Sequence, residues 1–342
     1  MVRRRPLTRL VVVALACVLL AGCARRGDTT PTAIARVAPT PVPGALSLLT
    51  EPDQGVTPIY SLLDAAQHGI DLTMYELVDP QTVQALEHAV ARGVDVRVIL
   101  DRNREKSANQ PAYDELTGHG VRVVWADSRY AATHEKAIVV DRAVAAVMSL
   151  NLTSRYYPDT RDYAVLDRQP ADVAAIEQVF DADFRHARTT TPTGDDLVWS
   201  PGSQATLLAL VGSATTTLLV ENEEMALPAM TSALENAAER GVQVTVVMTR
   251  ESDWADEFDG LVDAGVAVRT YAASASLYIH AKAIVVDAET AQRQAFVGSE
   301  NFSAASLQRN RELGLLTADP VLIGSLARTI EADAEGATAW QP

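Results

Sequence analysis

The chain has 342 residues, 48% of them hydrophobic and only 5% aromatic, and its formal net charge is −15. This length permits one large or two ordinary domains with sizeable cores. The acidic balance and the few aromatic side chains argue against a general nucleic-acid-binding protein, because polyanions are repelled and base stacking needs aromatic platforms.

Residues 1–22 are expected to be a signal peptide. Four arginines precede a continuous apolar run over residues 10–20, which is too short for a comfortable transmembrane helix. The segment Leu20-Ala21-Gly22-Cys23 resembles the box at which bacterial lipoproteins are processed, so Cys23 is the predicted lipidation site. Removing residues 1–22 with their four arginines gives a net charge of −15 − 4 = −19. We expect an extracytoplasmic, membrane-anchored lipoprotein; the alternative is an ordinary secretory signal.

A Thr/Pro-rich stretch over residues 23–45 predicts an extended tether. Beyond it, one pattern of strands and helices occurs twice, at residues 46–188 and 197–342, with a polar linker at 189–196. Apolar periodicity predicts strands at 46–49, 70–77, 94–100, 121–125, 217–220, 242–248 and 266–271. It predicts helices at 59–66, 82–92, 114–117, 171–187, 205–211, 230–240, 258–264 and 320–334. Strands that alternate with helices indicate the α/β class.

An eight-residue phrase also occurs twice. Residues 134–141 read His-Glu-Lys-Ala-Ile-Val-Val-Asp and residues 280–287 read His-Ala-Lys-Ala-Ile-Val-Val-Asp, so seven of eight positions are identical. The apolar run predicts a buried strand, on which residues two apart point to the same face. We therefore expect His134 to project with Lys136, and His280 with Lys282.

The doubled His-x-Lys-(four residues)-Asp pattern resembles the phospholipase D superfamily. The family pattern Gly-Ser-x-Asn follows each copy, as Gly298-Ser299-Glu-Asn301 in the second and, with Met148 in place of glycine, as Ser149 and Asn151 in the first. The resemblance covers roughly residues 46–335. It implies two tandem α/β/α-layered repeats packed about a pseudo-two-fold axis, with the active site between them. A monomer would then carry both half-sites.

The resemblance also implies a reaction through a phosphohistidine. His134 would attack phosphorus, and His280 would protonate the leaving alkoxide and later activate the second nucleophile. The two lysines with Asn151 and Asn301 would hold the phosphoryl oxygens. This scheme uses no cofactor and no metal, and the sequence has no obvious cluster with metal-ligand spacing.

Acidic and hydroxyl residues near the motifs complete the predicted site. Asp162 and Glu312 follow His134 and His280 by 28 and 32 residues. The resemblance implies that the acid in each half orients the motif histidine of that half. The motif aspartates Asp141 and Asp287 belong to the predicted catalytic set, although their place after a strand suggests a structural role. Ser149 and Ser299 are expected to support the phosphate or a nearby turn.

Acids at the ends of two predicted strands, Glu76, Glu221 and Glu223, are interpreted as solvated charges in preference to cleft residues. The functional prediction is a phospholipase D-like phosphodiesterase that hydrolyses a phospholipid to phosphatidic acid and an alcohol. Three alternatives remain: a phosphatidyltransferase like cardiolipin synthase, a metal-independent extracytoplasmic nuclease, and a catalytically silent binding lipoprotein.

Overall fold

The computed structural model describes residues 44–249 and 251–342, so the expected signal peptide, Cys23 and nearly all of the tether lie outside the described residues. The first repeat consists of β1 (Leu46–Glu51), α1 (Thr57–Asp64), β2 (Gly69–Met74), α2 (Pro80–Ala91), β3 (Asp95–Leu100), α3 (Lys106–Gly118), β4 (Arg122–Trp125), β5 (Ala137–Val140), β6 (Val144–Met148), β7 (Thr160–Asp167) and α4 (Pro170–Phe184).

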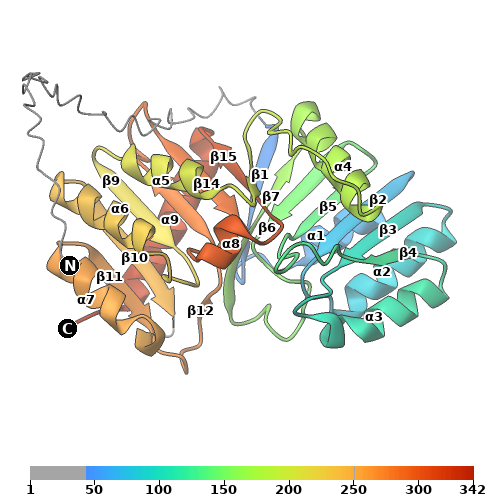
Figure 1. Cartoon of the computed structure of the whole chain (residues 1–342), viewed down its shortest axis with the longest axis horizontal. Helices are drawn as coiled ribbons and strands as arrows, with labels where there is room; N and C mark the ends of the chain where they lie inside the picture. Colours follow the sequence, from blue (N-terminus) through green and yellow to red (C-terminus); the bar gives the residue numbers. More distant parts are fainter. Residues whose placement is uncertain (1–43, 250) are drawn as a thin grey trace, which may run out of the picture. The chain divides into compact units, whose positions relative to one another are not determined.

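The second repeat follows the same plan (Figure 1). Its elements are β8 (Leu197–Ser200), α5 (Gln204–Gly212), β9 (Thr217–Glu221), α6 (Pro228–Glu239), β10 (Gln243–Thr249), the 3₁₀ turn η1 (Glu251–Asp253), α7 (Ala255–Asp263), β11 (Ala267–Tyr271), β12 (Tyr278–Ile279), β13 (Ala283–Val286), β14 (Gln294–Gly298), α8 (Ala304–Gln308), β15 (Glu312–Thr317), α9 (Pro320–Gly336) and β16 (Thr338–Ala339). Within the two described stretches, no helix is both long and apolar enough to cross a bilayer.

Each repeat contains a mixed sheet with the same strand order. The first sheet runs β1-β7-β6-β5-β2-β3-β4, and the second runs β8-β15-β14-β13-β9-β10-β11 with β16 at its edge. The strands connected through helices, β2 to β4 and β9 to β11, are parallel, and the other neighbours in these two strand orders are antiparallel. The short strand β12 of the second repeat pairs in parallel with β7 of the first. This confirms the predicted α/β class with two tandem repeats.

Alternate side chains of the motif strands enter two different cores. In β5, Ile138 and Val140 pack with the outer helices α1 to α3, whereas Ala137 and Val139 belong to a central core that contains residues of both repeats. Strand β13 divides its side chains in the same way. A strand buried on both faces needs a continuous apolar run, which explains the repeated Ala-Ile-Val-Val.

Helices α4 and α9 close the central core. Apolar side chains of both helices, among them Ile176, Val179, Ile323 and Leu326, pack there with strands of both sheets. Helix α9 begins after an aspartate cap, because Asp319 accepts hydrogen bonds from the backbone N–H groups of Val321 and Leu322. The repeats therefore share one buried apolar layer.

Met148 stands where the family pattern has glycine, and small neighbouring residues make room for its larger side chain. At Gly298, an added Cβ would lie 2.5 Å from the Cα of Gly314 and 2.8 Å from the Phe296 ring. The corresponding positions around Met148 in the first repeat are alanines, Ala146 and Ala164, and Met148 is fully buried. The small and large residues have exchanged places between the two repeats.

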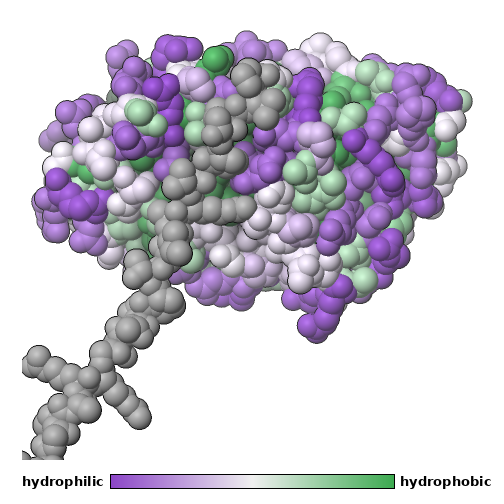
Figure 2. Space-filling model, turned by 90° about the horizontal axis from the view of Figure 1, so that it is seen from above, coloured by the Kyte–Doolittle hydropathy of each residue, from purple (hydrophilic) through white to green (hydrophobic). Residues whose placement is uncertain are grey.

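The surface is largely polar. Figure 2 shows a mostly hydrophilic face with small, separated apolar areas. Among the described residues, the large hydrophobic side chains classed as exposed are Val78, Tyr156 and Val321.

Candidate active site

The two His-x-Lys segments lie just before the motif strands, not within them as the apolar run predicted. His134 donates its backbone N–H to the carbonyl of Arg311 in the second repeat, at 2.9 Å. His280 follows β12, which pairs with Thr160 and Arg161 in the first repeat, and its N–H bonds the carbonyl of Arg161 at 3.2 Å. Each His-x-Lys segment is therefore hydrogen-bonded to the backbone of the other repeat.

The same crossing decides which acid holds which histidine. Nδ1 of His134 lies 2.7 Å from Oε2 of Glu312, and Nδ1 of His280 lies 2.8 Å from Oδ1 of Asp162. The expectation that each repeat orients its own histidine is therefore wrong, because each histidine enters the other repeat before it meets a carboxylate. Fixing Nδ1 as a donor leaves Nε2 of each ring for chemistry.

Buried ion pairs hold this crossing in place. Arg161 in β7 pairs with Asp333 in α9 at 2.6 Å, and Arg311 pairs with Asp183 in α4 at 2.7 Å. Each pair joins one repeat to the closing helix of the other. These four side chains, all nearly inaccessible, fix the strand ends that carry Asp162 and Glu312.

The environment of His134 favours its neutral form. Burial lowers the pKa of His134, and the nearby Lys136 adds to this effect, although Glu312 acts in the opposite direction. A neutral imidazole has a free lone pair on Nε2, which a nucleophile requires. The pKa of Glu312 is lowered: burial raises it, but His134 and Lys136 outweigh burial.

Both motif lysines lie beneath the histidines and are fully buried. Lys136 Nζ donates to the carbonyl of His134 at 2.7 Å and lies 5.0 Å from the centre of the Tyr75 ring. Burial, reinforced by the charge of Lys282, lowers the pKa of Lys136 to about 7. Lys282 also bonds its own motif histidine's carbonyl, but it has a carboxylate partner, Glu223, at 3.1 Å.

The structure divides the predicted phosphate ligands into two groups. Asn151 and Asn301 line the pocket together with both histidines. Ser149 and Ser299 are fully buried behind it: Ser149 Oγ donates to Asp162 at 2.5 Å, and Ser299 Oγ accepts from the backbone N–H of Leu313. Ser149 thus supports Asp162 directly, and Ser299 binds the backbone of the residue that follows Glu312. Of the two expected roles, support of the phosphate is corrected to support of local structure, because neither serine lines the pocket.

The motif aspartates also lie outside the pocket. Asp141 accepts three backbone hydrogen bonds, from Gln67, His68 and Gly69. Asp287 accepts backbone and hydroxyl bonds from the run Thr215 to Thr217. Both have positive φ angles at the turn after the motif strand. Their inclusion in the catalytic set is corrected to a structural role, in which they tie the motif hairpin to the neighbouring strand.

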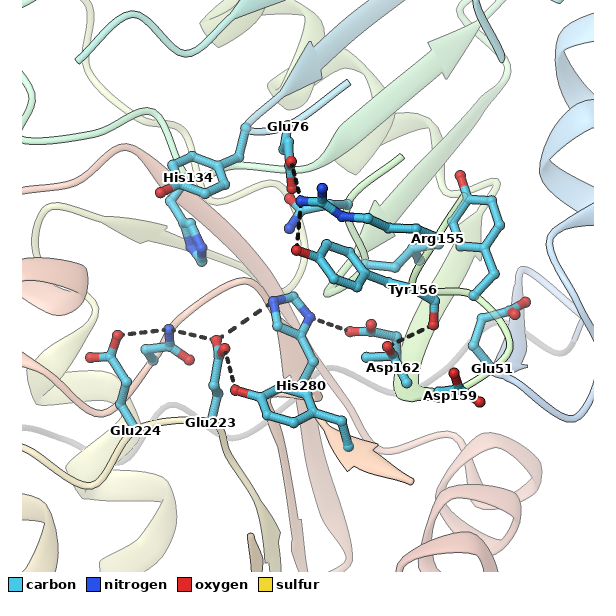
Figure 3. Close-up of a pocket in the computed structure, with 17 residues that line it drawn as sticks. Glu51, Glu76, His134, Arg155, Tyr156, Asp159, Asp162, Glu223, Glu224 and His280 are labelled. Carbon is cyan, nitrogen blue, oxygen red and sulfur yellow. Dashed lines mark hydrogen bonds and ion pairs between the residues drawn. The ribbon is translucent and has the colours of Figure 1, made fainter. Parts of the chain in front are cut away.

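The pocket between the repeats has a volume of about 480 Å³ and an acidic wall. Figure 3 shows the two imidazoles facing the same space and His280 placed between Glu223 and Asp162. Five further residues that line the pocket are carboxylates or a guanidinium: Glu51, Glu76, Asp159, Glu224 and Arg155.

The interpretation of the strand-end acids as solvated charges was wrong. Glu76 and Glu223 line the pocket, and Glu221 is fully buried with Tyr163 Oη donating to it at 2.7 Å. A signal existed in the sequence, because Glu76 and Glu223 follow equivalent strands, β2 and β9, two residues after the strand ends. Tyr278 is another pocket residue, and its hydroxyl donates to Glu223 at 3.0 Å.

Glu223 occupies the place where the donors of the second repeat converge. Its Oε2 lies 3.1 Å from Lys282 Nζ, 3.3 Å from Asn301 Nδ2 and 3.5 Å from His280 Nε2. Burial raises the pKa of Glu223, but the charges of Lys282 and His280 outweigh burial and hold this pKa far below its usual range. An anionic substrate has to compete with this carboxylate.

The site can therefore support two-step transfer of a phosphoryl group. Such chemistry needs a neutral imidazole for attack, a second imidazole for proton transfer and cationic groups near the phosphoryl oxygens, and His134, His280 and the two buried lysines are groups of these types. Away from the pocket, Asp167, Asp172 and Asp196 form a cluster with metal-ligand spacing, which the sequence did not indicate.

A family model described as "Cardiolipin synthase, PLD-like domain" matches residues 59–184 and 207–334, once in each repeat. The chain belongs to the phospholipase D superfamily. The predicted superfamily is thereby confirmed, and the crossed histidine–carboxylate pairs are the form its doubled motif takes in this chain.

Superfamily relatives include cardiolipin synthase A of Yersinia pseudotuberculosis serotype O:1b (strain IP 31758) and of Yersinia pestis bv. Antiqua (strain Angola). Each is 24% identical over an alignment 339 positions long, which spans 83% of this chain and 68% of the relative. Among solved structures, phosphatidylserine synthase of Haemophilus influenzae Rd KW20 has a TM-score of 0.69 at 12% identity and covers 89% of both chains. Polyphosphate kinase from Porphyromonas gingivalis has a TM-score of 0.66 at 14% identity, covering 84% of this chain and 46% of that one. These two structural likenesses show a shared fold.

Proposed function

We propose that this phospholipase D superfamily member transfers a phosphatidyl group from a phospholipid to an alcohol through a phosphohistidine. The observation that carries the proposal is the pair of imidazoles in one pocket, each held at Nδ1 by a carboxylate of the other repeat. Similarity to proteins named cardiolipin synthase, over 83% of the chain, supports a lipid substrate and an alcohol acceptor.

In the first step, Nε2 of His134 attacks phosphorus and the bond from phosphorus to the head-group oxygen breaks. Protonated His280 donates the proton of its Nε2 to the departing oxygen, so the head group leaves as an alcohol. In the second step, His280 takes the proton of the acceptor hydroxyl as that oxygen attacks phosphorus. The bond from phosphorus to His134 then breaks, which regenerates the neutral imidazole.

The remaining polar groups act on charge and position. The ammonium groups of Lys136 and Lys282 stabilise negative charge on the phosphoryl oxygens from below the pocket, where burial strengthens their effect. Asn151 and Asn301 bind those oxygens directly in this proposal, which their place in the pocket lining supports.

Hydrolysis to phosphatidic acid is the second candidate, since it differs only in using water as the acceptor. The pocket has a polar wall, and the His280 side chain retains 13% of its exposure, which gives water a route to the intermediate. The partition between the two outcomes depends on whether an alcohol or water reaches phosphorus first.

The test uses the purified full chain with phosphatidylglycerol vesicles and added ethanol. Cardiolipin or phosphatidylethanol as the main product supports transfer, and phosphatidic acid alone would replace transfer with hydrolysis. If wild type and His134→Ala both leave the lipid unchanged, the lipid proposal fails, and cleavage of DNA by wild type alone would point to a nuclease. Glu289→Gln, an exposed acid outside the pocket, is the matched control and should retain wild-type turnover.

We also propose that Cys23 anchors the protein outside the cytoplasm by a lipid chain, which would hold the pocket beside its substrate. Support comes from the lipoprotein-like box that ends at Cys23. Cys23→Ala should move the protein from the membrane fraction to the soluble fraction, provided that its signal segment is still removed. A processed Cys23→Ala protein that stays with the membrane would contradict the anchor.

A further inference from the structure

Three aspartates from different segments meet beside the linker between the repeats. Asp167 ends β7, Asp172 lies in the first turn of α4, and Asp196 immediately precedes β8. One carboxylate oxygen of each lies within 4.8 Å of the others. The cluster is independent of the active site, because Asp167 is five residues along β7 from Asp162, a separation of about 16 Å.

The cluster is almost completely withdrawn from water. Asp167 and Asp172 are fully buried, and Asp196 retains 4% of its exposure. None of the ion pairs found among residues 44–249 and 251–342 includes any of the three. Three carboxylates are thus packed together without a basic side chain, although buried charges normally have a partner.

Hydrogen-bond donors satisfy only part of the cluster. The backbone N–H of Gln169 donates to Asp167 Oδ1 at 2.7 Å, its side-chain amide donates to Asp172 Oδ2 at 3.0 Å, and the N–H of Asp195 donates to Asp172 Oδ1 at 2.6 Å. Asp167 Oδ2 and Asp196 Oδ1 are buried and have no hydrogen-bond partner among the described residues. Both oxygens belong to the group of three carboxylates, which has acceptors in excess and no positive centre among the described residues.

The linker is shaped to close over these carboxylates. At Gly194, which has a φ of +51°, an added Cβ would lie 2.0 Å from Asp172 Oδ1. Only glycine permits the linker backbone to approach Asp172 this closely. On the other side, the carbonyl of Asp196 accepts from the N–H of Leu316 in β15, so the cluster joins β7 and α4 of the first repeat to the second sheet.

We propose that Asp167, Asp172 and Asp196 bind a calcium ion that fastens the linker between the two repeats. An all-oxygen set without histidine or cysteine suits a hard cation and disfavours zinc. Calcium takes ligands from carboxylates and backbone carbonyls in flexible geometry, whereas magnesium usually keeps several of its waters, so a cluster this deeply buried suits calcium better. The unpartnered oxygens of Asp167 and Asp196 become ligands.

Retention of protons is the competing way to relieve the charge. Burial, together with the neighbouring carboxylates, raises the pKa of Asp196 to about 9 and that of Asp167 to about 7. Protonation and calcium binding give opposite results in the following test, because only a calcium site responds to the metal.

The experiment measures calcium binding to the EDTA-treated, desalted full chain by titration calorimetry and by thermal unfolding. We expect one calcium per chain, at least tenfold weaker magnesium binding, and a rise in Tm of roughly 3–5 °C at a hundredfold excess over Kd. Calcium should also slow tryptic cleavage after the exposed Arg188, at the start of the linker. None of these readouts depends on the proposed lipid activity.

Neutral variants separate a binding site from a merely acidic patch. Asp196→Asn and Asp167→Asn should lose calcium binding at least tenfold, and their Tm in EDTA should equal or exceed that of wild type, because each leaves one carboxyl group fewer crowded in the buried cluster. Asp256→Asn, at an exposed acid in α7, should keep the full calcium response. A wild-type protein with the same Tm in EDTA and in 10 mM calcium, a response that survives in both neutral variants, or equally tight magnesium binding would overturn the proposal.

Discussion

Replacing Glu312 by glutamine should disable His134 without changing the shape of the site. Oε1 of Glu312 accepts from Ser306 Oγ at 2.6 Å and from Asn310 Nδ2 at 2.9 Å, while Oε2 meets His134 Nδ1 at 2.7 Å. In the variant, those two donors keep the amide oxygen on their side. The amide NH₂ therefore faces Nδ1, which must become an acceptor, and the ring proton moves to Nε2.

This change affects the nucleophile twice. Loss of a charge-assisted hydrogen bond to a buried histidine costs about 1.5–3 kcal/mol, and holding the ring in the unreactive tautomer adds a similar amount. Since about 1.4 kcal/mol corresponds to a tenfold change in rate, kcat should fall roughly 10²- to 10⁴-fold. The fold should survive, because the substitution keeps the volume and the contacts to Ser306 and Asn310.

The matched variant is Asp162→Asn, which acts on His280. A phosphatidyl ester of p-nitrophenol needs no proton on its leaving group, so Asp162→Asn should still release a burst of p-nitrophenol, although it is slow on phosphatidylglycerol. Glu312→Gln should be slow on both substrates. A Glu312→Gln enzyme within tenfold of wild type would refute the role of the crossed carboxylates, and a burst in Glu312→Gln alone would reverse the roles of the two histidines.

Further predictions concern charge in and around the pocket. Burial lowers the pKa of Lys136 to about 7, and a bound anion favours the protonated form of this lysine. The affinity for the anion tungstate should therefore fall up to tenfold per pH unit above pH 7.5. Lys136→Met should bind tungstate weakly, and its affinity should depend less on pH. Glu223→Gln removes the competing carboxylate and should tighten tungstate binding at least tenfold by calorimetry; unchanged affinity would mean that Glu223 moves aside at no cost. Hydrogen bonds from Thr215, Thr216 and Thr217 outweigh burial and lower the pKa of Asp287 to about 2, so this carboxylate stabilises the fold above pH 4 and loses that effect as pH falls through about 2. Asp287→Asn should cost about 2 kcal/mol in urea unfolding at pH 7, and an unchanged unfolding free energy would contradict the role assigned to the motif aspartates.

Local patterns in the sequence predicted the parts of the fold that depend on local physics. The apolar run in each motif identified β5 and β13, because alternate residues must fill two cores. Gly93 and Gly241, with φ near +90°, mark the ends of α2 and α6, where a left-handed residue closes the helix. The doubled motif was enough to identify the superfamily.

What the sequence could not predict depends on contacts between the repeats. Glu312 lies 178 residues from the histidine it holds, and no periodicity indicates that β12 crosses to β7 and exchanges the carboxylates. The matched positions of Glu76 and Glu223 after equivalent strands were visible in the sequence, but only the fold shows that both line a pocket shared by the two repeats. The aspartate cluster likewise forms only when a strand end, a helix turn and the linker meet.

The covalent intermediate is the most direct test of the central claim. The full chain would be mixed with phosphatidylglycerol, quenched in alkali within the first turnover, digested and analysed by mass spectrometry. A phosphatidyl or phosphoryl group on His134, absent from His134→Ala and consumed at the rate at which an added alcohol forms the transfer product, is the predicted result. Steady turnover of the lipid by wild type with neither His134 nor His280 ever labelled would contradict the two-histidine mechanism.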